Sequence, residues 1–440
     1  MKVKSKSKKI QILEKILRFL ARAVINKYNP KIIGITGSVG KSSAKEAIAL
    51  VLTSKFRVRK SEKNYNNEIG IPLTILGSES GESSFLGWSR VFAKGIFLLI
   101  FPWEYPEILV LEMAVDQPGD MDYLLSFVSP DVGVITNISA SHMEFFGSVE
   151  NIAKEKGKLI KGIRNGGMAI INGDDSEIVK IKRDAPVKYI EFGFQDKLKV
   201  QATDANFNYI DGKISGISFK LNYQGKIVPF RLPHILAFHQ IYSILAAVSI
   251  GMQFKINLVD MAQSLENYFP PCGRMNLISG KNGSNIIDDT YNSSPASAIA
   301  ALKTVAGTSA SRRIAVLGDM LELGSESESG HSRVAAEVFS SGVDLFFAVG
   351  KRMETAVSDY LKSEKKIEGD EKKVFYFDNP SVTAIELEKI IKNDDLILVK
   401  GSQSMRMEKV VENIMEKQFD ARELLCRQSK EWRKKPFIEP

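Results

Sequence analysis

The chain has 440 residues, which is too many for one compact core of ordinary size and predicts two to three domains. Hydrophobic residues make up 44% of it and charged residues 25%, as in soluble globular proteins, which argues against a disordered or a membrane-spanning class. Only two cysteines and four histidines occur, without zinc-like spacing, so any metal should be held mainly by oxygen ligands, which suits magnesium.

The N-terminus combines a basic arm with an amphipathic helix. The first nine residues hold five lysines and no acid. Apolar residues then recur at helical spacing between basic ones, at Ile10, Leu13, Ile16, Leu17, Leu20 and Val24. The charges interrupt any signal-peptide core and are too frequent for a bilayer span, so secretion is not expected. Two interpretations stay open, because the helix could pack on the next domain or attach to an anionic membrane surface.

Short β-rich runs alternate with helical stretches from Lys31 onward. KIIGIT, FRVRKS, EILVLEM and VGVITNI are typical of strands, and the first is followed by a helical segment from Ser42, which predicts a mostly parallel sheet. Residues 198–230 instead alternate polar and apolar residues, with Asp211-Gly212 and Gln224-Gly225 as turns. This second pattern indicates antiparallel hairpins attached to the same domain.

Residues 85–103, FLGWSRVFAKGIFLLIFPW, are unusually rich in aromatic side chains. The segment is too short to span a bilayer, and Arg90 and Lys94 leave only a brief unbroken apolar stretch. It is therefore expected to be a helix that packs on the protein or an interfacial helix on a membrane. Peripheral membrane contact would involve residues 1–28 and 85–103.

Helical segments are expected near 238–254 and 258–268, and the prolines and glycine at 270–273 then break the pattern. NIIDDTY, RRIAVLGDM, DLFFAVG, KVFYFD and DLILVKG restart the strand–helix alternation. The sequence therefore predicts an α/β architecture. Its parts are a basic amphipathic helix in 1–30, a phosphate-loop domain with a mostly parallel sheet and a small antiparallel part in 31–270, and a Rossmann-like α/β domain in 271–440.

Strand KIIGIT leads into a glycine loop and then into the helical segment AKEAIALVL. Glycines let the backbone curl round a phosphate, and a helix N-terminus supplies unpaired N–H groups. Lys41 would neutralise phosphate charge, and the Ser42 hydroxyl could ligate magnesium. Ile35 stands where the general Walker pattern has glycine, but the strand and helix context supports a nucleotide site. The candidate ATP-binding residues here are Gly37, Ser38, Val39, Gly40, Lys41, Ser42 and Ser43.

At this loop the sequence resembles the Mur ligases, whose pattern T-G-[ST]-x-G-K-[TS] matches residues 36–42 position by position. Three further motifs follow in the order of the family: NYNNEIGIP at 64–72, DDTYN at 288–292 and LGDMLELG at 317–324. They are similar to the MurF branch, which adds D-alanyl-D-alanine to UDP-MurNAc-tripeptide. The resemblance covers about residues 31–410, and its specificity comes from the ordered series of motifs.

The resemblance implies a set of metal ligands. Glu112 in LEMA and His142 in SHMEFF match positions that bind magnesium beside Ser42. Without the resemblance, Glu112 could equally be a surface acid and His142 a structural histidine. Lys156 matches the lysine that Mur ligases carry as a carbamate, an anion able to support a second magnesium, and an ordinary solvated helix face with neighbouring lysines is the alternative. Metal and lysine together would lower the repulsion between ATP and an attacking carboxylate.

The resemblance also implies nucleotide contacts. Asn67 matches a polar residue near the reacting phosphate, so the implied catalytic set is Lys41, Asn67, Glu112, His142 and Lys156. Two residues match the helix near the adenine, and three match positions of the C-terminal domain that close over the nucleotide. These five are His239, Gln240, Arg274, Asp289 and Asn292. Closure of two domains is expected because it excludes water from a hydrolysable acyl phosphate.

The sequence departs from the family at two places. The H-N-x-x-N helix near the adenine reads HQIYS at 239–243, which predicts altered adenine recognition. Only about thirty residues precede the phosphate loop, where MurF enzymes carry a domain for the UDP-sugar. The uridine-binding module is therefore expected to be missing, with a partner or the insert at 85–103 in its place, or with a different acceptor.

The resemblance implies an ATP-dependent amide-bond ligase of peptidoglycan precursor synthesis that uses Mg²⁺, UDP-MurNAc-peptide and a D-alanyl-D-alanine-like amine. Two alternatives stay open: another ligase of the superfamily, such as a folylpolyglutamate synthetase, and a catalytically inactive, membrane-associated ATP-binding protein. We expect a cytoplasmic monomer, with the inner membrane surface as a further location. No nucleic-acid partner is expected, because the basic residues are not interleaved with aromatic ones.

Overall fold

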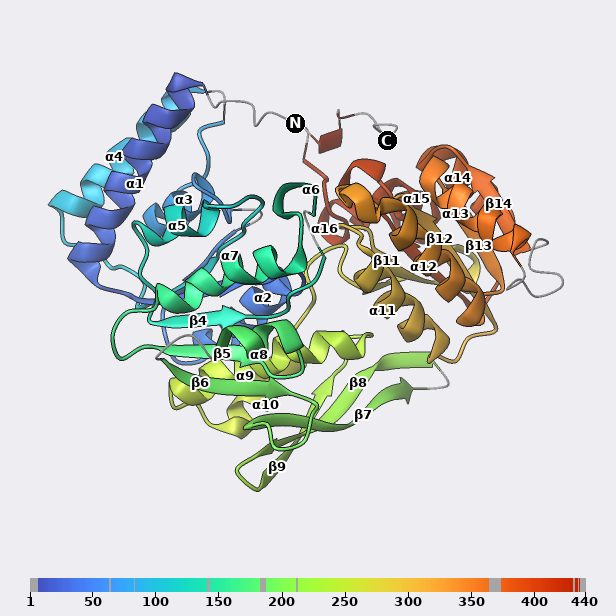
Figure 1. The fold of residues 1–440 in the computed structure, drawn as a ribbon, viewed down its shortest axis with the longest axis horizontal. Helices are drawn as coiled ribbons and strands as arrows, with labels where there is room; N and C mark the ends of the chain where they lie inside the picture. The colour runs from blue at the N-terminus through green and yellow to red at the C-terminus, as the bar shows by residue number, and fades with distance from the viewer. Residues whose placement is uncertain are drawn as a thin grey trace.

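The computed structural model describes residues 7–62, 65–82, 84–140, 143–182, 187–210, 213–363, 373–429, 432–433 and 435. The N-terminal part of the chain forms a larger sheet with its helices, and the C-terminal part forms a smaller one beside it (Figure 1). The predicted fold class is confirmed, because a mostly parallel sheet with an antiparallel extension is followed by a second α/β unit. The proposed domain boundaries stay predictions.

The larger sheet has nine strands in the described chain, in the order β2-β3-β1-β4-β5-β6-β7-β8-β9. All neighbours from β2 to β7 run parallel, whereas β8 and β9 are antiparallel additions at one edge. The strands are β1 (Lys31–Thr36), β2 (Val58–Lys60), β3 (Ile108–Glu112), β4 (Val132–Ile135), β5 (Met168–Asn172), β6 (Lys188–Gly193), β7 (Val200–Ile210), β8 (Lys213–Tyr223) and β9 (Lys226–Leu232).

The antiparallel strands expected within residues 198–230 are present, and the structure adds that they extend the larger sheet itself. The turn at Gln224-Gly225 has left-handed backbone at both residues and joins the paired residues Tyr223 and Lys226. The other predicted turn, Asp211-Gly212, lies outside the described residues. The sequence interpretation did not identify β5 and β6, although both consist largely of apolar residues.

Strand β1 is buried on both faces because its side chains alternate between two cores. Ile33 and Ile35 belong to one core and Ile32 to the other. The first core contains α2 (Lys41–Thr53), α9 (Ile241–Gln253) and α10 (Leu258–Glu266). The second contains α3 (Gly70–Leu76), α5 (Asp120–Leu125), α6 (Met143–Phe146), α7 (Val149–Lys161) and α8 (Ser176–Lys182).

The smaller sheet has the order β10-β11-β15-β12-β13-β14, and only the edge strand β10 is antiparallel to its neighbour. Its strands are β10 (Asn276–Ser279), β11 (Asn285–Asp289), β12 (Arg312–Gly318), β13 (Leu345–Val349), β14 (Val374–Phe377) and β15 (Asp395–Lys400). Its helices pack in two cores: α11 (Pro295–Ala306), α12 (Ser327–Ser340) and α13 (Lys351–Lys362), then α14 (Pro380–Glu388), α15 (Glu408–Ile414) and α16 (Ala421–Leu424). Short 3₁₀ turns lie at Phe238–Gln240, Lys281–Gly283, Gly324–Glu326, Gln403–Met405 and Gln418–Asp420.

The two segments of ambiguous character, helices α1 (Lys8–Tyr28) and α4 (Phe85–Ile100), lie side by side at the outer edge of the larger domain (Figure 1). They pack closely where Gly95 faces Leu20, since a Cβ at Gly95 would lie 3.1 Å from the Leu20 Cδ1. Leu17, Leu20 and Val24 are buried as the pattern predicts, but Ile10, in the first turn of α1, and Ile16 are exposed. Among the described residues, no helix is both long and apolar enough to cross a membrane.

Candidate active site

The phosphate loop connects the end of β1 to the start of α2 and is fixed from outside by the chain that follows β4. The Thr136 hydroxyl donates to the Val39 carbonyl at 2.6 Å, and the Ser38 amide donates to the Asn137 carbonyl at 2.7 Å. Gly40 precedes α2 in the left-handed conformation that a residue with a side chain rarely adopts. The loop is therefore held open at a helix N-terminus before any ligand binds, which favours an anion there.

Gly37 lies so close to the next strand that a side chain does not fit, because a Cβ at this position would overlap the Thr136 hydroxyl. We expect Gly37→Ala to lower the free energy of unfolding by about 1–3 kcal/mol and to weaken ATP binding by about tenfold or more. Chemical denaturation and titration calorimetry measure the two effects. Gly166→Ala is the matched control, since Gly166 also has positive φ but has nothing within 4 Å of its Cβ position. Unchanged ATP affinity in Gly37→Ala would contradict the assigned loop.

Lys41 begins α2 and folds back over the loop. Its ammonium donates to the Gly37 carbonyl at 2.7 Å and more weakly to the Ser38 carbonyl at 3.4 Å. Burial lowers the pKa of Lys41, the negative charge of Glu112 opposes this effect, and the positive charge of Arg274 adds to it. Lys41 thus lies within the electrostatic reach of residues from both domains.

Glu112 ends β3, next to β1 in the sheet, and its partner in the register is Ile35. One carboxylate oxygen accepts a hydrogen bond from the Asn66 amide at 3.1 Å. The other is buried, lies 3.8 Å from the Lys45 ammonium, and has no hydrogen-bond partner among the described residues. Because an unpaired buried carboxylate oxygen is costly, its position beside the phosphate loop fits a bound cation.

Lys156 lies on α7 and is almost completely buried. Burial lowers its pKa to about 7, with a further lowering by the charge of Lys41, while the acids Asp116 and Glu155 act in the opposite direction. Its neighbour on the same helix, Lys154, is exposed. The alternative of an ordinary solvated helix face therefore describes Lys154 but does not describe Lys156.

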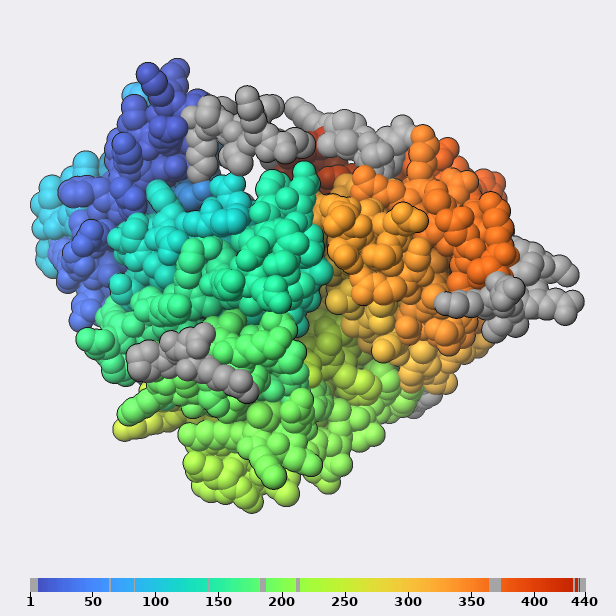
Figure 2. All heavy atoms as spheres, in the orientation of Figure 1, coloured from blue at the N-terminus to red at the C-terminus, as the bar shows by residue number. Residues whose placement is uncertain are grey.

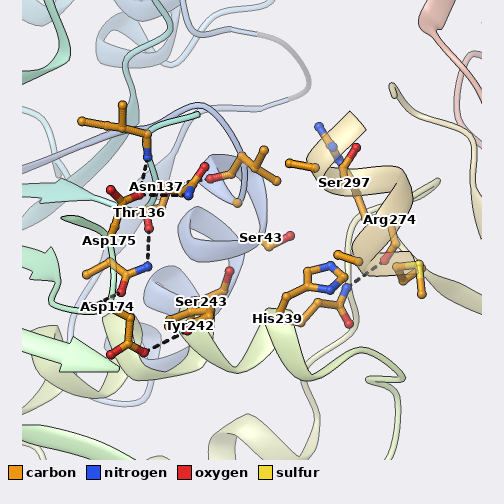
Figure 3. Close-up of a pocket in the computed structure, with 18 of the residues that line it drawn as sticks. Ser43, Thr136, Asn137, Asp174, Asp175, His239, Tyr242, Ser243, Arg274 and Ser297 are labelled. Carbon is orange, nitrogen blue, oxygen red and sulfur yellow. Dashed lines mark hydrogen bonds between the residues drawn. The ribbon is translucent and has the colours of Figure 1, made fainter. Parts of the chain in front are cut away.

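A cavity of about 450 Å³ lies between the two domains, directly beside the phosphate loop (Figure 3). On the side of the larger domain, Val39, Ser42 and Ser43 line it. On the side of the smaller domain, Asp289 and Lys400 line it, together with Arg274 from the linking segment and three residues at the start of α11. A ligand in this cavity would contact both domains at once, and its volume is in the range of small-molecule sites.

One wall of the cavity carries two adjacent acids after β5. Asp174 accepts the hydroxyl of Tyr242 at 2.9 Å and the Phe194 amide at 2.6 Å. Asp175 accepts the side-chain amide of Asn137 at 3.0 Å, which connects this wall to the segment that fixes the phosphate loop (Figure 3). Burial raises the pKa of Asp175. Within the part of the chain that the structure describes, the acids are held by hydrogen bonds and not by counter-ions, so their polar oxygens are positioned to accept hydrogen bonds from a ligand.

His239 and Gln240 lie where α9 begins and line the cavity from below the loop. Burial lowers the pKa of His239, so the imidazole is neutral at neutral pH. The Gln240 amide donates to the Arg274 carbonyl at 2.9 Å, while its buried oxygen has no partner among the described residues. Gln240 therefore positions the segment that carries Arg274, and its free oxygen can accept a further hydrogen bond.

The loop after β11 is joined to β15 by Lys400. The Lys400 ammonium pairs with Asp289 at 2.6 Å and donates to the Asn292 carbonyl at 2.8 Å. Arg274 stacks over the ring of Tyr291, with 4.1 Å from the guanidinium carbon to the ring centre. These contacts hold one wall of the cavity, and the Asn292 side chain itself is exposed and not among the lining residues.

The structure brings most of the predicted residues together but leaves some elsewhere. The loop residues, Glu112 and Lys156 surround Lys41, and His239, Gln240, Arg274 and Asp289 line the cavity. His142 lies outside the described residues. Asn67 is exposed, and its side-chain oxygen accepts the Gly70 amide at 2.9 Å at the start of α3, so its predicted contact with phosphate stays a prediction.

Sequence reasoning missed several residues of this site. Asn66 was part of the recognised motif but was passed over for its neighbour, although the contact with Glu112 comes from Asn66. Asp174 and Asp175 follow β5, a strand outside the sequence prediction, although polar residues at the end of a parallel strand are a usual sign of a ligand site. The remaining missed residues are Lys45, Asp116, Thr136, Tyr242, Lys400 and Arg427.

Arg427, in the C-terminal tail, clamps the loop after β11. Its guanidinium donates to the carbonyls of Thr290 and Tyr291 and pairs with Glu408 at 3.0 Å. The Arg427 guanidinium also lies over the ring of Tyr291, and the Arg274 guanidinium makes a second cation–π contact with the same ring. The tail therefore supports a wall of the cavity mainly through the Arg427 side chain, with a further contact of 3.6 Å between the Cys426 Sγ and the Thr290 hydroxyl.

We expect Arg427→Ala to raise the KM for ATP by about tenfold, while kcat at saturating ATP changes little. The variant loses the contacts that order the loop after β11, which would weaken the binding free energy of ATP by about 1.4 kcal/mol. Steady-state kinetics with varied ATP measures this split. Arg433→Ala is the control, since Arg433 is an exposed tail arginine paired with Glu412. Equal KM values for the two variants would show that the tail does not support the nucleotide wall.

Comparison with known proteins agrees with this geometry. Residues 96–251 match the Mur ligase middle domain, and residues 273–403 match the Mur ligase glutamate ligase domain. A UDP-N-acetylmuramoyl-tripeptide–D-alanyl-D-alanine ligase from Bacillus subtilis is 31% identical over 401 residues, which cover 91% of this chain and 79% of the relative. The chain belongs to the Mur ligase family. Mur ligases are ATP-dependent enzymes that form C–N bonds, and this Mur ligase is of that class.

Two solved structures extend the similarity to the arrangement of both domains. MurF from Acinetobacter baumannii superposes with a TM-score of 0.75 at 25% identity and covers 91% of this chain and 80% of its own. MurF from Thermotoga maritima in complex with ADP superposes with a TM-score of 0.74 at 26% identity and covers 91% of this chain and 83% of its own. This Mur ligase therefore shares its fold over both domains with MurF enzymes.

Proposed function

We propose that this Mur ligase forms an amide bond on a peptidoglycan precursor at the expense of ATP. The carboxylate of a UDP-MurNAc-peptide attacks the γ-phosphorus of ATP, which gives an acyl phosphate and ADP. The amine of D-alanyl-D-alanine, or of a similar compound, then attacks the acyl carbon, loses a proton and releases phosphate. The observation that carries this proposal is the gathering of Lys41, Glu112 and Lys156 around one phosphate loop.

The residues of the loop would bind the triphosphate. Backbone N–H groups of residues 37–43 would donate to phosphate oxygens, and Lys41 would exchange its present contacts with loop carbonyls for a phosphate. His239, Gln240, Arg274 and Asp289 would hold the nucleotide between the domains, with Asn292 following from the resemblance alone. Closure of the smaller domain, 271–440, onto the larger, 31–270, would exclude water from the acyl phosphate.

Mg²⁺ fits the donor set beside the loop. Ser42 and Glu112 would hold it together with His142, which the resemblance supplies, and the unpartnered oxygen of Glu112 supports this arrangement. A carbamate on Lys156 would provide an anionic ligand for a second ion. Bound Mg²⁺ would neutralise phosphate charge and so favour attack by an anionic carboxylate. Asn66 would keep the Glu112 carboxylate oriented toward the ion.

We further propose that the enzyme acts as a monomer in the cytoplasm. Its substrates would be UDP-MurNAc-peptide and a D-alanyl-D-alanine-like amine, as the name of the Bacillus relative suggests. Residues 1–28 and 85–103 would provide peripheral contact with the inner membrane surface. The exposed apolar side chains of α1 and α4 support that contact.

ADP release with UDP-MurNAc-tripeptide plus D-alanyl-D-alanine tests the proposal, with omission of the dipeptide as the control. We expect turnover that requires both substrates and yields the pentapeptide product by mass spectrometry. Turnover with folate plus glutamate alone would instead favour a folylpolyglutamate synthetase. ATP binding without amine-dependent ADP release would favour a catalytically inactive protein.

A further inference from the structure

Helices α1 and α4 leave an unusually large apolar surface uncovered. Eleven of the 24 large hydrophobic side chains that are exposed in the described chain lie on α1 or within residues 85–103. Phe19, Leu86 and Ile100 are each 65–70% exposed, and Trp103 is 60% exposed. Single exposed hydrophobic residues are ordinary in soluble proteins, but a concentration of this kind marks a binding surface.

Several of the exposed residues recur at helical spacing on the two helices. On α1, Ile12, Ile16 and Phe19 follow each other at spacings of four and three residues. On α4, Ile96 and Ile100 are one turn apart, and the aromatic rings of Phe97, Phe101 and Trp103 cluster at the C-terminal end, with ring centres 5.0–5.5 Å apart. We call the exposed apolar side chains of α1 and of residues 85–103 the α1/α4 face.

The packing of the two helices excludes the simplest explanation, in which this face belongs to their own contact. Their buried residues, such as Leu20, Val91 and Leu98, already fill the space between the helices and the domain. The Lys27 ammonium further closes the contact by donating to the carbonyls of Leu98 and Phe101, both at 2.8 Å. The helix pair is thus fixed in place, and its remaining large apolar side chains are exposed. The pair lies at the edge of the molecule away from the smaller domain (Figures 1 and 2).

The exposed charges on helices α1 and α4 themselves have one sign, whereas two exposed acids flank residues 85–103, Glu82 before α4 and Glu104, which pairs with Arg57, after Trp103. Helix α4 contains no acid, and the only acid of α1, Glu14, is buried. The exposed charged residues of the two helices are all basic: Lys8, Lys9, Lys15, Arg22, Lys27, Arg90 and Lys94. An apolar face with a basic rim complements an anionic bilayer surface, into which apolar and aromatic side chains insert while lysines and arginines contact headgroups. A second copy of the chain would bring like charges together, which disfavours it as the occupant.

We propose that the α1/α4 face docks the enzyme on an anionic lipid bilayer, with α1 and α4 lying in the interface plane. The contact refines the peripheral membrane association of the proposed function and does not depend on the ligase reaction. Because α1 and α4 are packed on the larger domain, the docked surface holds that domain at a fixed orientation to the bilayer. Substrates carried at or near the membrane would meet the active site without release of the enzyme.

Flotation of the full chain with vesicles tests the proposal. We expect binding to phosphatidylglycerol–phosphatidylcholine vesicles and at least about fivefold less to pure phosphatidylcholine vesicles, since the charge contribution is then lost. Ile100→Glu should reduce the bound fraction by about tenfold, whereas Ile227→Glu should not. The two isoleucines are 65% and 64% exposed, so they differ mainly in location. Lys15→Glu with Arg22→Glu should also reduce binding, and Lys226→Glu should not.

Equal flotation of Ile100→Glu and Ile227→Glu would overturn the proposal, as would no flotation of the unmodified chain. A stable dimer in light scattering that is lost in Ile100→Glu would assign the face to a second copy and would overturn it as well. Unchanged thermal unfolding of Ile100→Glu excludes misfolding as the cause of lost binding. ADP release in solution is measured separately, so failure of docking and failure of the ligase function can be told apart.

Discussion

Lys41→Ala is expected to lower ADP formation by about 100- to 1,000-fold, the size of effect seen when a donor to transition-state charge is removed. In the present structure the Lys41 ammonium donates to the carbonyls of Gly37 and Ser38, both in the loop that would surround the phosphates. The loop therefore holds the positive charge where negative charge would develop during phosphoryl transfer. Steady-state ADP release measures the loss.

Lys55→Ala is the matched control, because Lys55 lies exposed just beyond the other end of α2. Burial lowers the pKa of Lys41, so the folded state does not gain stability from this charge, and Lys41→Ala should unfold at an equal or higher temperature. Loss of activity together with an unchanged or raised Tm would locate the effect in the reaction. Activity within about threefold of the unmodified enzyme would contradict the assigned role.

The fold could be predicted where local pattern and burial agree. Strand β1 was recognisable because a parallel strand covered on both faces is apolar nearly throughout, and the loop after it because glycine, lysine and serine occur at fixed spacing. Glu112 was assigned to the same region only through the resemblance to the Mur ligases, and the structure places it beside β1, where it pairs in register with Ile35.

The rest of the site depends on contacts that local sequence does not encode. Whether Asn66 or Asn67 reaches Glu112 depends on how the segment turns before α3, where the Asn67 oxygen accepts an amide of that helix. The clamp by Arg427 joins residues 136 positions apart, and its neighbours in the sequence are ordinary charged residues of a basic tail. The same limit applies to α1, since its helical period could not reveal that Ile16 is exposed.

Lys156→Ala is expected to reduce activity by about 10- to 100-fold, as for a residue that supports a metal site. The surroundings of Lys156 favour a carbamate, because its amine is buried near the positive charge of Lys41. The Lys156 ammonium is repelled by that charge, whereas a carbamate anion on Lys156 would be attracted to it. The reaction with CO₂ needs the unprotonated amine. Since burial lowers the pKa of Lys156 to about 7, a large share of the amine is unprotonated at neutral pH.

The expected pH dependence of the carbamate content follows from the lowered pKa of Lys156. Below about pH 7 the amine of Lys156 gains a proton and no longer reacts with CO₂, so carbamate content should fall as the pH decreases through that value. A ¹³C NMR signal of the carbamate, formed with ¹³C-bicarbonate, should follow this course and vanish in Lys156→Ala. Lys154→Ala should keep the signal, because Lys154 is exposed on the same helix. A signal that persists in Lys156→Ala would place the carbamate elsewhere, and full activity of both variants in CO₂-free buffer would show that the reaction does not need one.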